Sequence, residues 1–394
     1  MKRKEIPSMN VPALFEVLRV SFKLGLTSFG GPVAHLGYFR AEYVEKRKWL
    51  DERAFADLVA LCQVLPGPAS SQVGIAIGMM RAGWLGGVAS WIGFTMPSAI
   101  LLAVFAWLLQ GMDAGEPSWL HGLLVAAVAI VAQAVWGMAK SLTPDRPRAT
   151  LAVCAAIVTL LWPSALVQIL LILAAGLIGW TWLAKPSVVN VQEAPLHLSK
   201  RGAVLCLLLL AACLLGLPWV RPTSPLLAEF DSFFRVGSLV FGGGHVVLPM
   251  LQAEVVPTGW ITETQFLAGY GAAQAVPGPL FTFASYIGAI LAGWKGAVIA
   301  TVAIFLPSFL LVGGSLPFWS TLRGMPKVQA VLNGINAAVV GILLAALYNP
   351  VWTKAIREPI DVALALLTFG LLVFWKVPAW VVVLVCGGIG SLLY

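Results

Sequence analysis

Charged residues are scarce in this sequence. Asp, Glu, Lys and Arg make up 11% of its 394 residues, whereas a soluble domain carries about 25%. Hydrophobic residues make up 59%, and the mean hydropathy is +0.90. This balance excludes an ordinary soluble protein and predicts a polytopic membrane protein. The net charge of +8 comes from short basic clusters between apolar runs, which set orientation in a lipid bilayer. We therefore expect no nucleic-acid partner.

Metal-ligand clusters and catalytic motifs are also missing. The sequence has four scattered histidines and five cysteines, and the cysteines lie inside apolar runs without metal-binding spacing. It contains no phosphate loop, no dinucleotide fingerprint and no Gly-x-Ser-x-Gly motif. We expect no metal site, no cofactor and no enzymatic activity. A membrane enzyme acting on lipid phosphates is one rival reading, and it would require clustered acids or metal ligands at an interface.

Long apolar runs fill most of the chain. Each is compatible with a membrane helix of about 17 to 25 residues or a broken variant of one. They predict an all-α protein with about 13 membrane segments. The segments are expected near 13–30, 54–81, 84–110, 118–140, 149–162, 164–184, 202–220, 226–243, 264–292, 294–316, 328–349, 360–376 and 378–394.

Two of these runs are interrupted by the same motif. The stretch from Gln63 to Pro68 ends in Pro-Gly-Pro, and so does the stretch from Gln274 to Pro279. Pro-Gly-Pro cannot remain α-helical, because proline lacks an amide donor and forces the preceding residue toward extended geometry. Freed backbone groups are tolerated at membrane depth only inside protein or beside a wet cavity. Matched breaks in two halves are the best sequence pointer to a transporter's central site.

The repetition extends well beyond Pro-Gly-Pro. Phe22-Lys23-Leu24-Gly25 and Phe29-Gly30-Gly31 recur in order as Phe234-Arg235-Val236-Gly237 and Phe241-Gly242-Gly243. Such ordered matches indicate a duplication. We predict a first repeat at 1–190, a connecting segment with an extra transmembrane helix at 191–225, and a second repeat at 226–394.

The basic loops predict the orientation. We expect Lys2-Arg3-Lys4, Arg81, Lys140, Lys185 and Arg323 in the cytoplasm and the acidic loop Asp113–Glu116 outside. The run near 202–220 has no counterpart, so its single crossing would invert the second half relative to the first. The N-terminus, which lacks a small-residue cleavage site, is then retained and cytoplasmic, and the C-terminus periplasmic or extracellular. The basic loop 40–53 conflicts with this scheme unless the segments flanking it are re-entrant hairpins.

Two repeated cations suggest an anion site. Lys23 and Arg235 occupy matched positions, and each would be costly facing lipid. Glycine runs let backbone amides converge on an anion, and polar residues near the breaks can donate hydrogen bonds. The candidate substrate-binding residues are Lys23, Arg235, Gly30, Gly31, Gly242, Gly243, Gly244, Gln63, Pro66, Gly67, Pro68, Ser70, Ser71, Gln274, Pro277, Gly278, Pro279 and Thr282.

Each of these assignments has a plainer alternative. Glu16, Arg19 and Lys23 form one helical stripe that also fits an interfacial helix, and glycines can simply allow close helix packing. Glu42, Glu254, His35 and His245 are candidate proton relays. Ordinary salt bridges or structural hydrogen bonds would equally explain those four.

At these motifs the chain resembles the chromate ion transporter (CHR) family in its long two-domain form. The resemblance rests on four stretches that together cover both halves. They are Phe29–Pro32 with Ala34-His35, Gln63–Pro68, Phe241–Gly244 with Leu248-Pro249, and Gln274–Pro279.

The resemblance implies export of chromate through the bacterial inner membrane, driven by the proton gradient and conferring chromate resistance. Protons, the lipid bilayer and a chromate or sulfate-like dianion are the implied partners, and a homodimer is one expected assembly. A sulfate-like oxyanion importer is the alternative transporter, and a purely structural membrane scaffold is a further rival.

Overall fold

The structure contains helices and connecting segments and no strand in the residues it describes. It is a computed structural model that describes residues 11–111, 118–183, 200–318 and 325–393. The all-α prediction is confirmed for these residues. Lys2-Arg3-Lys4, Lys185, Arg323 and the loop Asp113–Glu116 lie outside them.

The first half of the chain contains the helices α1 to α7. Their bounds are α1 Val11–Thr27, α2 Gly31–Phe39, the π-helical turn η1 Arg40–Lys46, α3 Glu52–Val64, α4 Ala69–Gln110, α5 Ser118–Leu142, α6 Arg146–Leu161 and α7 Ala165–Trp182. The rest of the chain contains the remaining helices. They are α8 Lys200–Val220, η2 Arg221–Thr223, α9 Pro225–Leu239, η3 Gly244–Val246, α10 Val247–Val255, α11 Glu263–Ala275, η4 Leu280–Thr282, α12 Phe283–Ser315, η5 Leu316–Phe318, α14 Pro326–Ala346, η6 Leu347–Trp352, α15 Thr353–Ala355, α16 Pro359–Val373 and α17 Ala379–Leu393.

Six helical stretches in the described residues are long and apolar enough to cross a membrane. They are Ala69–Gln110, Ser118–Leu142, Ala165–Trp182, Lys200–Thr223, Leu280–Phe318 and Pro326–Ala355. Two shorter apolar helices, α16 and α17, follow them.

The Pro-Gly-Pro motifs end helices as the sequence predicts. Helix α3 stops where Leu65 becomes extended, and α11 stops where Val276 does so, because each residue precedes a proline. The following glycines, Gly67 and Gly278, have φ angles of 111° and 101°. Those angles suit glycine and strain other residues, so the motif fixes a sharp break in each half.

The longest helices are in fact tight hairpins. Residues Ala82 and Gly83 depart from helical geometry within α4, and Ala292 and Gly293 do so within α12. Each helix doubles back there, and glycines on the two arms contact each other: Gly78 meets Gly86, and Gly288 meets Gly296. Because glycine lets two backbones approach closely, these residues serve as packing contacts.

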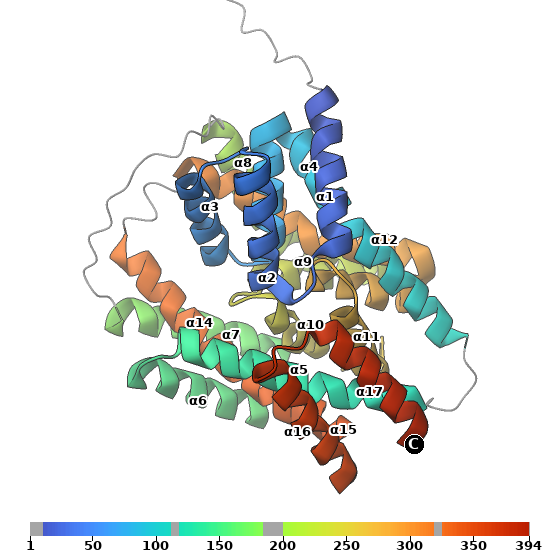
Figure 1. The fold of residues 1–394 in the computed structure, drawn as a ribbon. Coiled ribbons are helices and arrows are strands. Elements are labelled where there is room, and N and C mark those ends of the chain that lie inside the picture. The colour runs from blue at the N-terminus through green and yellow to red at the C-terminus, as the bar shows by residue number, and fades with distance from the viewer. Residues whose placement is uncertain (1–10, 112–117, 184–199, 319–324, 394) are drawn as a thin grey trace, which may run out of the picture.

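The first half folds back on itself twice. Lys23 of α1 bonds Glu42 of η1 at 3.1 Å, and Arg47 bonds Glu16 of α1 at 2.8 Å, so the α1 and α2–η1 segments run antiparallel. Arg81, after the second break, also reaches Glu16 at 3.2 Å. All outer ends of these helices therefore lie at one end of the molecule, and both breaks point into its middle. Figure 1 shows α1, α2, α3 and the first arm of α4 gathered at that end.

The second half folds back in the same way. Ser232 of α9 donates to Glu254 of α10 at 3.1 Å, and Tyr286 of α12 donates to the carbonyl of Gln265 in α11 at 2.7 Å. The breaks of this half also lie in the interior.

The two halves meet through a reciprocal pair of backbone hydrogen bonds. The Gly67 amide donates to the carbonyl of Val240 at 2.6 Å, and the Gly278 amide donates to the carbonyl of Ser28 at 2.9 Å. The proline break of each half thus binds the glycine break of the other.

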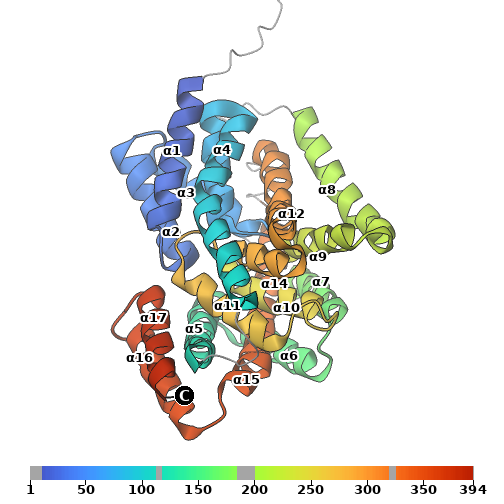
Figure 2. The ribbon, with the colours of Figure 1, turned by 90° about the vertical axis from the view of Figure 1, so that its right-hand side faces the viewer.

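The long arms of α4 and α12 also pass each other in opposite directions. Trp84, at the start of one arm, packs against Gly313, near the end of the other. Gln110, at the far end, donates to the carbonyl of Ile290 at 2.9 Å, just before the hairpin turn of α12. Figure 2 shows α4 and α12 side by side.

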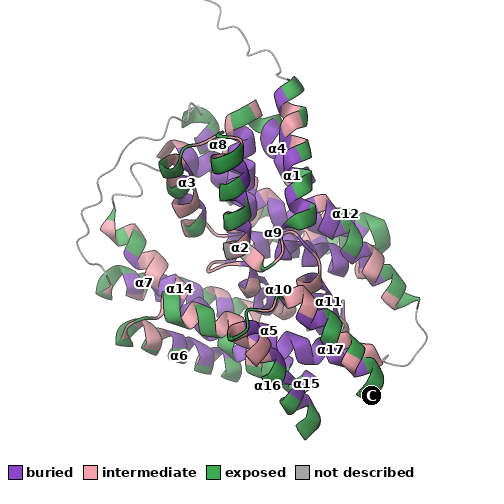
Figure 3. Ribbon diagram, viewed as in Figure 1, coloured by how far each residue is buried: buried purple, intermediate pink, exposed green. Residues whose placement is uncertain are grey.

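Apolar side chains face outward as well as inward. Helix α8 is exposed along most of its length, and Leu205, Leu215 and Trp219 are 66%, 73% and 85% exposed. Exposed residues, green in Figure 3, also appear along α6, α16 and α17. Polar residues such as Ser90, Thr95 and Ser308 are buried. A protein with an apolar exterior and polar groups inside is suited to lipid as its solvent.

We predict that Gly67→Ala and Gly278→Ala destabilise the protein by about 1–3 kcal/mol each, because both glycines have positive φ. A Cβ would also lie 2.8 Å from Gln72 Nε2 at Gly67 and 2.8 Å from Ser98 Oγ at Gly278. Thermal unfolding in detergent measures the effect. Gly37→Ala is the control, because its helical position has open space around it. Unchanged melting temperatures for both break variants would contradict a structural role for the crossing.

Candidate functional site: a cavity at the crossing of the breaks

A cavity of about 250 Å³ lies where the glycine break of the first half meets the proline break of the second. Since one water occupies about 30 Å³ of liquid, it has room for a small ion and several waters. It is lined by Gly30, Gly31, Ile130, Gln133, His245, Ala273, Gln274, Val276, Gly278, Leu280, Leu372, Lys376, Val377, Pro378 and Ala379.

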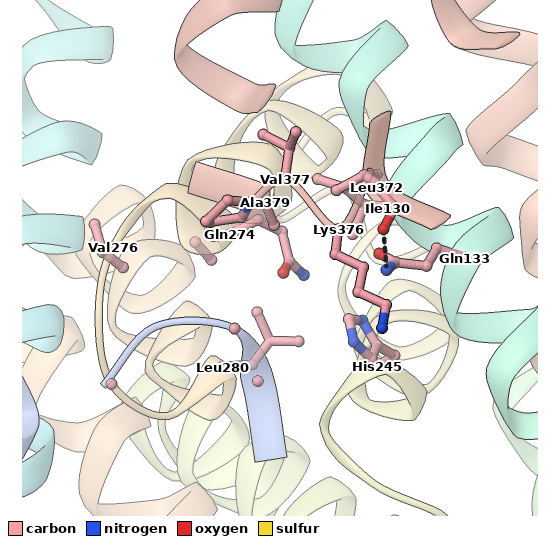
Figure 4. A pocket seen from close by; sticks show the side chains of 15 residues that line it. Ile130, Gln133, His245, Gln274, Val276, Leu280, Leu372, Lys376, Val377 and Ala379 are labelled. Carbon is pink, nitrogen blue, oxygen red and sulfur yellow. Dashed lines mark hydrogen bonds between the residues drawn. The ribbon is translucent and has the colours of Figure 1, made fainter. Parts of the chain in front are cut away.

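Four polar side chains from different elements share this cavity. Figure 4 shows Lys376, His245, Gln133 and Gln274 pointing into the same space. No aspartate or glutamate is among the described residues that line it. A cavity with one cation, two amides and an imidazole, and without a carboxylate, is suited to an anion.

Lys376 is presented by the short loop between α16 and α17. Its φ angle is +55°, which is uncommon for a residue with a side chain and is often found at functional sites. The loop is fixed by the Val377 amide, which donates to the carbonyl of Leu371 at 3.0 Å. Gln133 of α5 donates to the carbonyl of Leu372 at 3.4 Å, so α5 and this loop are joined beside the cavity.

His245 and Gln274 come from the second half. The Nδ1 atom of His245 and the hydroxyl of Tyr270 lie 2.9 Å apart, which leaves the other ring nitrogen toward Gly31. The Nε2 amide nitrogen of Gln274 is buried and makes no hydrogen bond with the described residues. It is therefore a donor that a bound anion could satisfy.

The first half contributes backbone to the cavity. Gly30 and Gly31 have φ angles of 95° and 80°, and α2 begins at Gly31. The first amides of a helix have no intrahelical acceptor and attract anions.

Five of the predicted binding or relay residues line this cavity: Gly30, Gly31, His245, Gln274 and Gly278. Lys23 and Arg235 do not line it. Each belongs to an ion cluster about one turn before the glycine break that follows its helix.

Lys23 is bound to Glu42, and its side chain is 54% exposed. Glu42 is itself buried and accepts a further hydrogen bond from Arg47 at 2.9 Å. Burial raises the pKa of Glu42, but the hydrogen bonds from Arg47 and Lys23 outweigh it, so the pKa is lowered overall. Glu42 therefore stays ionised at neutral pH in this arrangement.

Arg235 forms an ion pair with Asp231, one turn earlier in α9. Asp231 also faces Arg221 at 3.4 Å, and Arg221 lies 3.7 Å from Glu254. The two matched cations of the repeat are thus each held by a buried carboxylate of their own half.

The other predicted residues lie around the breaks. The Nδ1 atom of His35 and the hydroxyl of Ser70 are 3.2 Å apart, and Thr282 donates to the carbonyl of Pro279 at 2.7 Å. The hydroxyl of Ser71 is buried without a hydrogen-bond partner among the described residues.

The remaining predicted binding residues belong to the backbone of the breaks or to the surface. Pro66 accepts a hydrogen bond from Gln72 at 2.6 Å, and Gln63 is exposed. The others are Gly67, Pro68, Gly242, Gly243, Gly244 and Pro277, which form the turns themselves.

Sequence reasoning missed Lys376 and Gln133. Gln133 is a polar residue within the apolar run 118–140, and that isolation is a usable signal. Lys376 looks like an ordinary loop lysine between two apolar segments, and its strained backbone and its position at the cavity depend on contacts with distant elements.

The chain matches the family described as "Chromate transporter" over residues 15–180 and 227–391. The chromate transport protein of Pseudomonas aeruginosa is 31% identical over 98% of this chain and 94% of its own length. The chromate transport protein of Cupriavidus metallidurans is 29% identical over 92% of this chain and 88% of its own length. An uncharacterized transporter of Methanocaldococcus jannaschii is 26% identical over 98% of this chain and 91% of its own length. No solved structure shows a significant match.

We predict that a cysteine at Ala379 reacts with a small charged thiosulfonate about tenfold faster than one at Ala127, because thiol reactivity requires access and ionisation. Ala379 lines the cavity, whereas Ala127 of α5 is fully buried. The background replaces Cys154, Cys206 and Cys213 by alanine, since Cys62 and Cys386 are already buried. Mass spectrometry measures the rate of labelling at each position. Equal rates at Ala379 and Ala127 would show that water does not reach the cavity.

Proposed function

This chain belongs to the chromate transporter family, and we propose that it carries chromate across the membrane by binding it in the cavity at the crossing of the breaks. The observation that carries the proposal is the cavity's chemistry: Lys376, His245 and two glutamine amides surround it, and no carboxylate lines it among the described residues. A doubly charged oxyanion needs such donors when it leaves water.

We propose further that the two halves are inverted repeats with re-entrant hairpins, within about 13 membrane segments and the domain limits 1–190, 191–225 and 226–394. The reciprocal hydrogen bonds at Gly67 and Gly278 support this, as do the opposite directions of the α4 and α12 arms. If the two segments that flank loop 40–53 are re-entrant hairpins, this basic loop lies on the cytoplasmic side with the other cations. That placement agrees with the positive-inside rule.

The proposed direction is outward from the bacterial cytoplasm, across the inner membrane, which would confer chromate resistance. Export of a dianion from a negative interior gains about 2.3 kcal/mol per charge per 100 mV. Coupling to protons would use Glu254, His35 or His245, or Glu42 in a state in which Lys23 and Arg47 have moved away from it. Lys23 and Arg235 would act as charges that attract the anion. A homodimer is the assembly we propose.

We predict that Lys376→Gly lowers kcat/KM for chromate in proteoliposomes by about tenfold or more, the usual cost of one hydrogen bond to a charged group. Glycine tolerates the positive φ at this position, so the variant should fold normally. Lys295→Gln, which removes an exposed charge on α12, is the matched control. An unchanged flux in Lys376→Gly would exclude the lysine from the binding site.

We predict that inside-out vesicles accumulate chromate faster when an imposed pH gradient makes their lumen acidic, because proton exit through an exchanger would drive anion entry. The measurement is the initial uptake rate with and without the gradient, at fixed membrane potential. Sulfate added to the same vesicles reports selectivity by competition. Rates that ignore the gradient would rule out proton coupling. Saturable uptake of sulfate alone into right-side-out vesicles would favour the sulfate-like importer.

A further inference from the structure

A second hollow, of about 520 Å³, lies at the outer end of the first half and shares no residue with the central cavity. Its lining residues come from α1, from the end of η1 and the loop that follows it, and from the end of the first arm of α4. They are Glu16, Lys46, Arg47, Lys48, Trp49 and Arg81.

The hollow carries more cations than its carboxylates can neutralise. Glu16 receives Arg47 at 2.8 Å and Arg81 at 3.2 Å. Glu42, just beneath, receives Lys23 at 3.1 Å, Lys46 at 3.7 Å and Arg47 at 2.9 Å. Two acids thus face these four cations and Lys48 as a fifth.

Lys48 forms no ion pair with a carboxylate of the described residues, so its charge is not neutralised there. An excess of positive charge in a concave site concentrates anions.

An aromatic ring holds the two guanidinium groups in place. Arg47 and Arg81 lie 5.6 Å and 5.3 Å from the centre of the Trp49 ring, within the range of cation–π attraction. Trp49 in turn stacks on the buried ring of Tyr43, with centroids 5.3 Å apart. Fixed guanidinium groups lose less freedom on binding, so this stack preorganises the hollow for a charged oxygen ligand.

The backbone of Lys48 is held in a left-handed conformation. Its φ angle is +54°, and in the second half the residue that likewise precedes the matched tryptophan, Trp260, is Gly259, with φ +73°. Glycine is the residue that the turn itself favours. A lysine at this strained position, beside other cations, points to a functional use of its charge. Lys48 and Lys376 are the non-glycine residues with positive φ among those described, and each lines a hollow suited to anions.

We propose that this hollow is a second anion site, which binds a phosphate-like tetrahedral group through Lys46, Lys48 and Arg81 beside Trp49. Free inorganic oxyanions and the phosphate of an acidic lipid headgroup share this chemistry. The proposal concerns binding alone and does not depend on transport through the central cavity.

The test compares Lys48→Gly with its parent protein in a Lys376→Gly background, which weakens the central site. Titration calorimetry with inorganic phosphate measures the free-anion arm, and sedimentation with phosphatidylglycerol vesicles, against phosphatidylcholine vesicles, measures the lipid arm. We expect Lys48→Gly to weaken the binding of phosphate, of phosphatidylglycerol vesicles, or of both by about fivefold. This is the upper range for the loss of a partly exposed charge. Because glycine relieves the strain, its melting temperature should stay equal or rise.

Lys295→Gln in the same background is the charge-matched control and should leave both arms unchanged. Loss of phosphate binding alone identifies a free oxyanion as the ligand, and loss of phosphatidylglycerol binding identifies the headgroup. If Lys48→Gly raises the melting temperature but changes neither arm, or if Lys295→Gln produces the same loss, the proposal is overturned.

Discussion

The fold depends on satisfying the backbone groups that four breaks expose inside an apolar protein. An unpaired amide or carbonyl in such a place costs as much as a lost hydrogen bond, and water is not freely available there. The chain solves this by exchange: Gly67 binds Val240, and Gly278 binds Ser28. This requirement explains why the breaks of both halves lie together in the middle, and why a polar cavity forms there.

Charge is distributed to suit the same constraint. The cations predicted to bind substrate, Lys23 and Arg235, are held by Glu42 and Asp231, so these two buried carboxylates are each paired with a cation. A buried charge without a partner would be strongly unfavourable. The central cavity differs, because Lys376 lines it from a short loop and is itself exposed. A cation with some access to water is available to an incoming anion at a lower desolvation cost.

Local chemistry made much of this fold predictable. The Pro-Gly-Pro breaks, the apolar runs and the hairpin turn after Arg81 follow from proline, glycine and hydropathy alone. The presence of Gly30, Gly31, Gln274 and Gly278 at the cavity follows from the broken backbone they belong to. The part played by Lys376 could not be predicted, since it depends on the packing of α16 and α17 against α5. The ion pairs of Lys23 and Arg235 likewise depend on how the hairpins fold back.

The exchanged hydrogen bonds make each half incomplete by itself. A polypeptide consisting of the first half alone would leave the Gly67 amide without an acceptor and the Ser28 carbonyl without a donor. It would have to pair with another copy that supplies them. Joining both in one polypeptide makes that association permanent and independent of concentration. When both halves are in one polypeptide, their sequences can also differ. His245 and Lys376 of the second half can therefore face Gly30 and Gly31 of the first half across one asymmetric cavity.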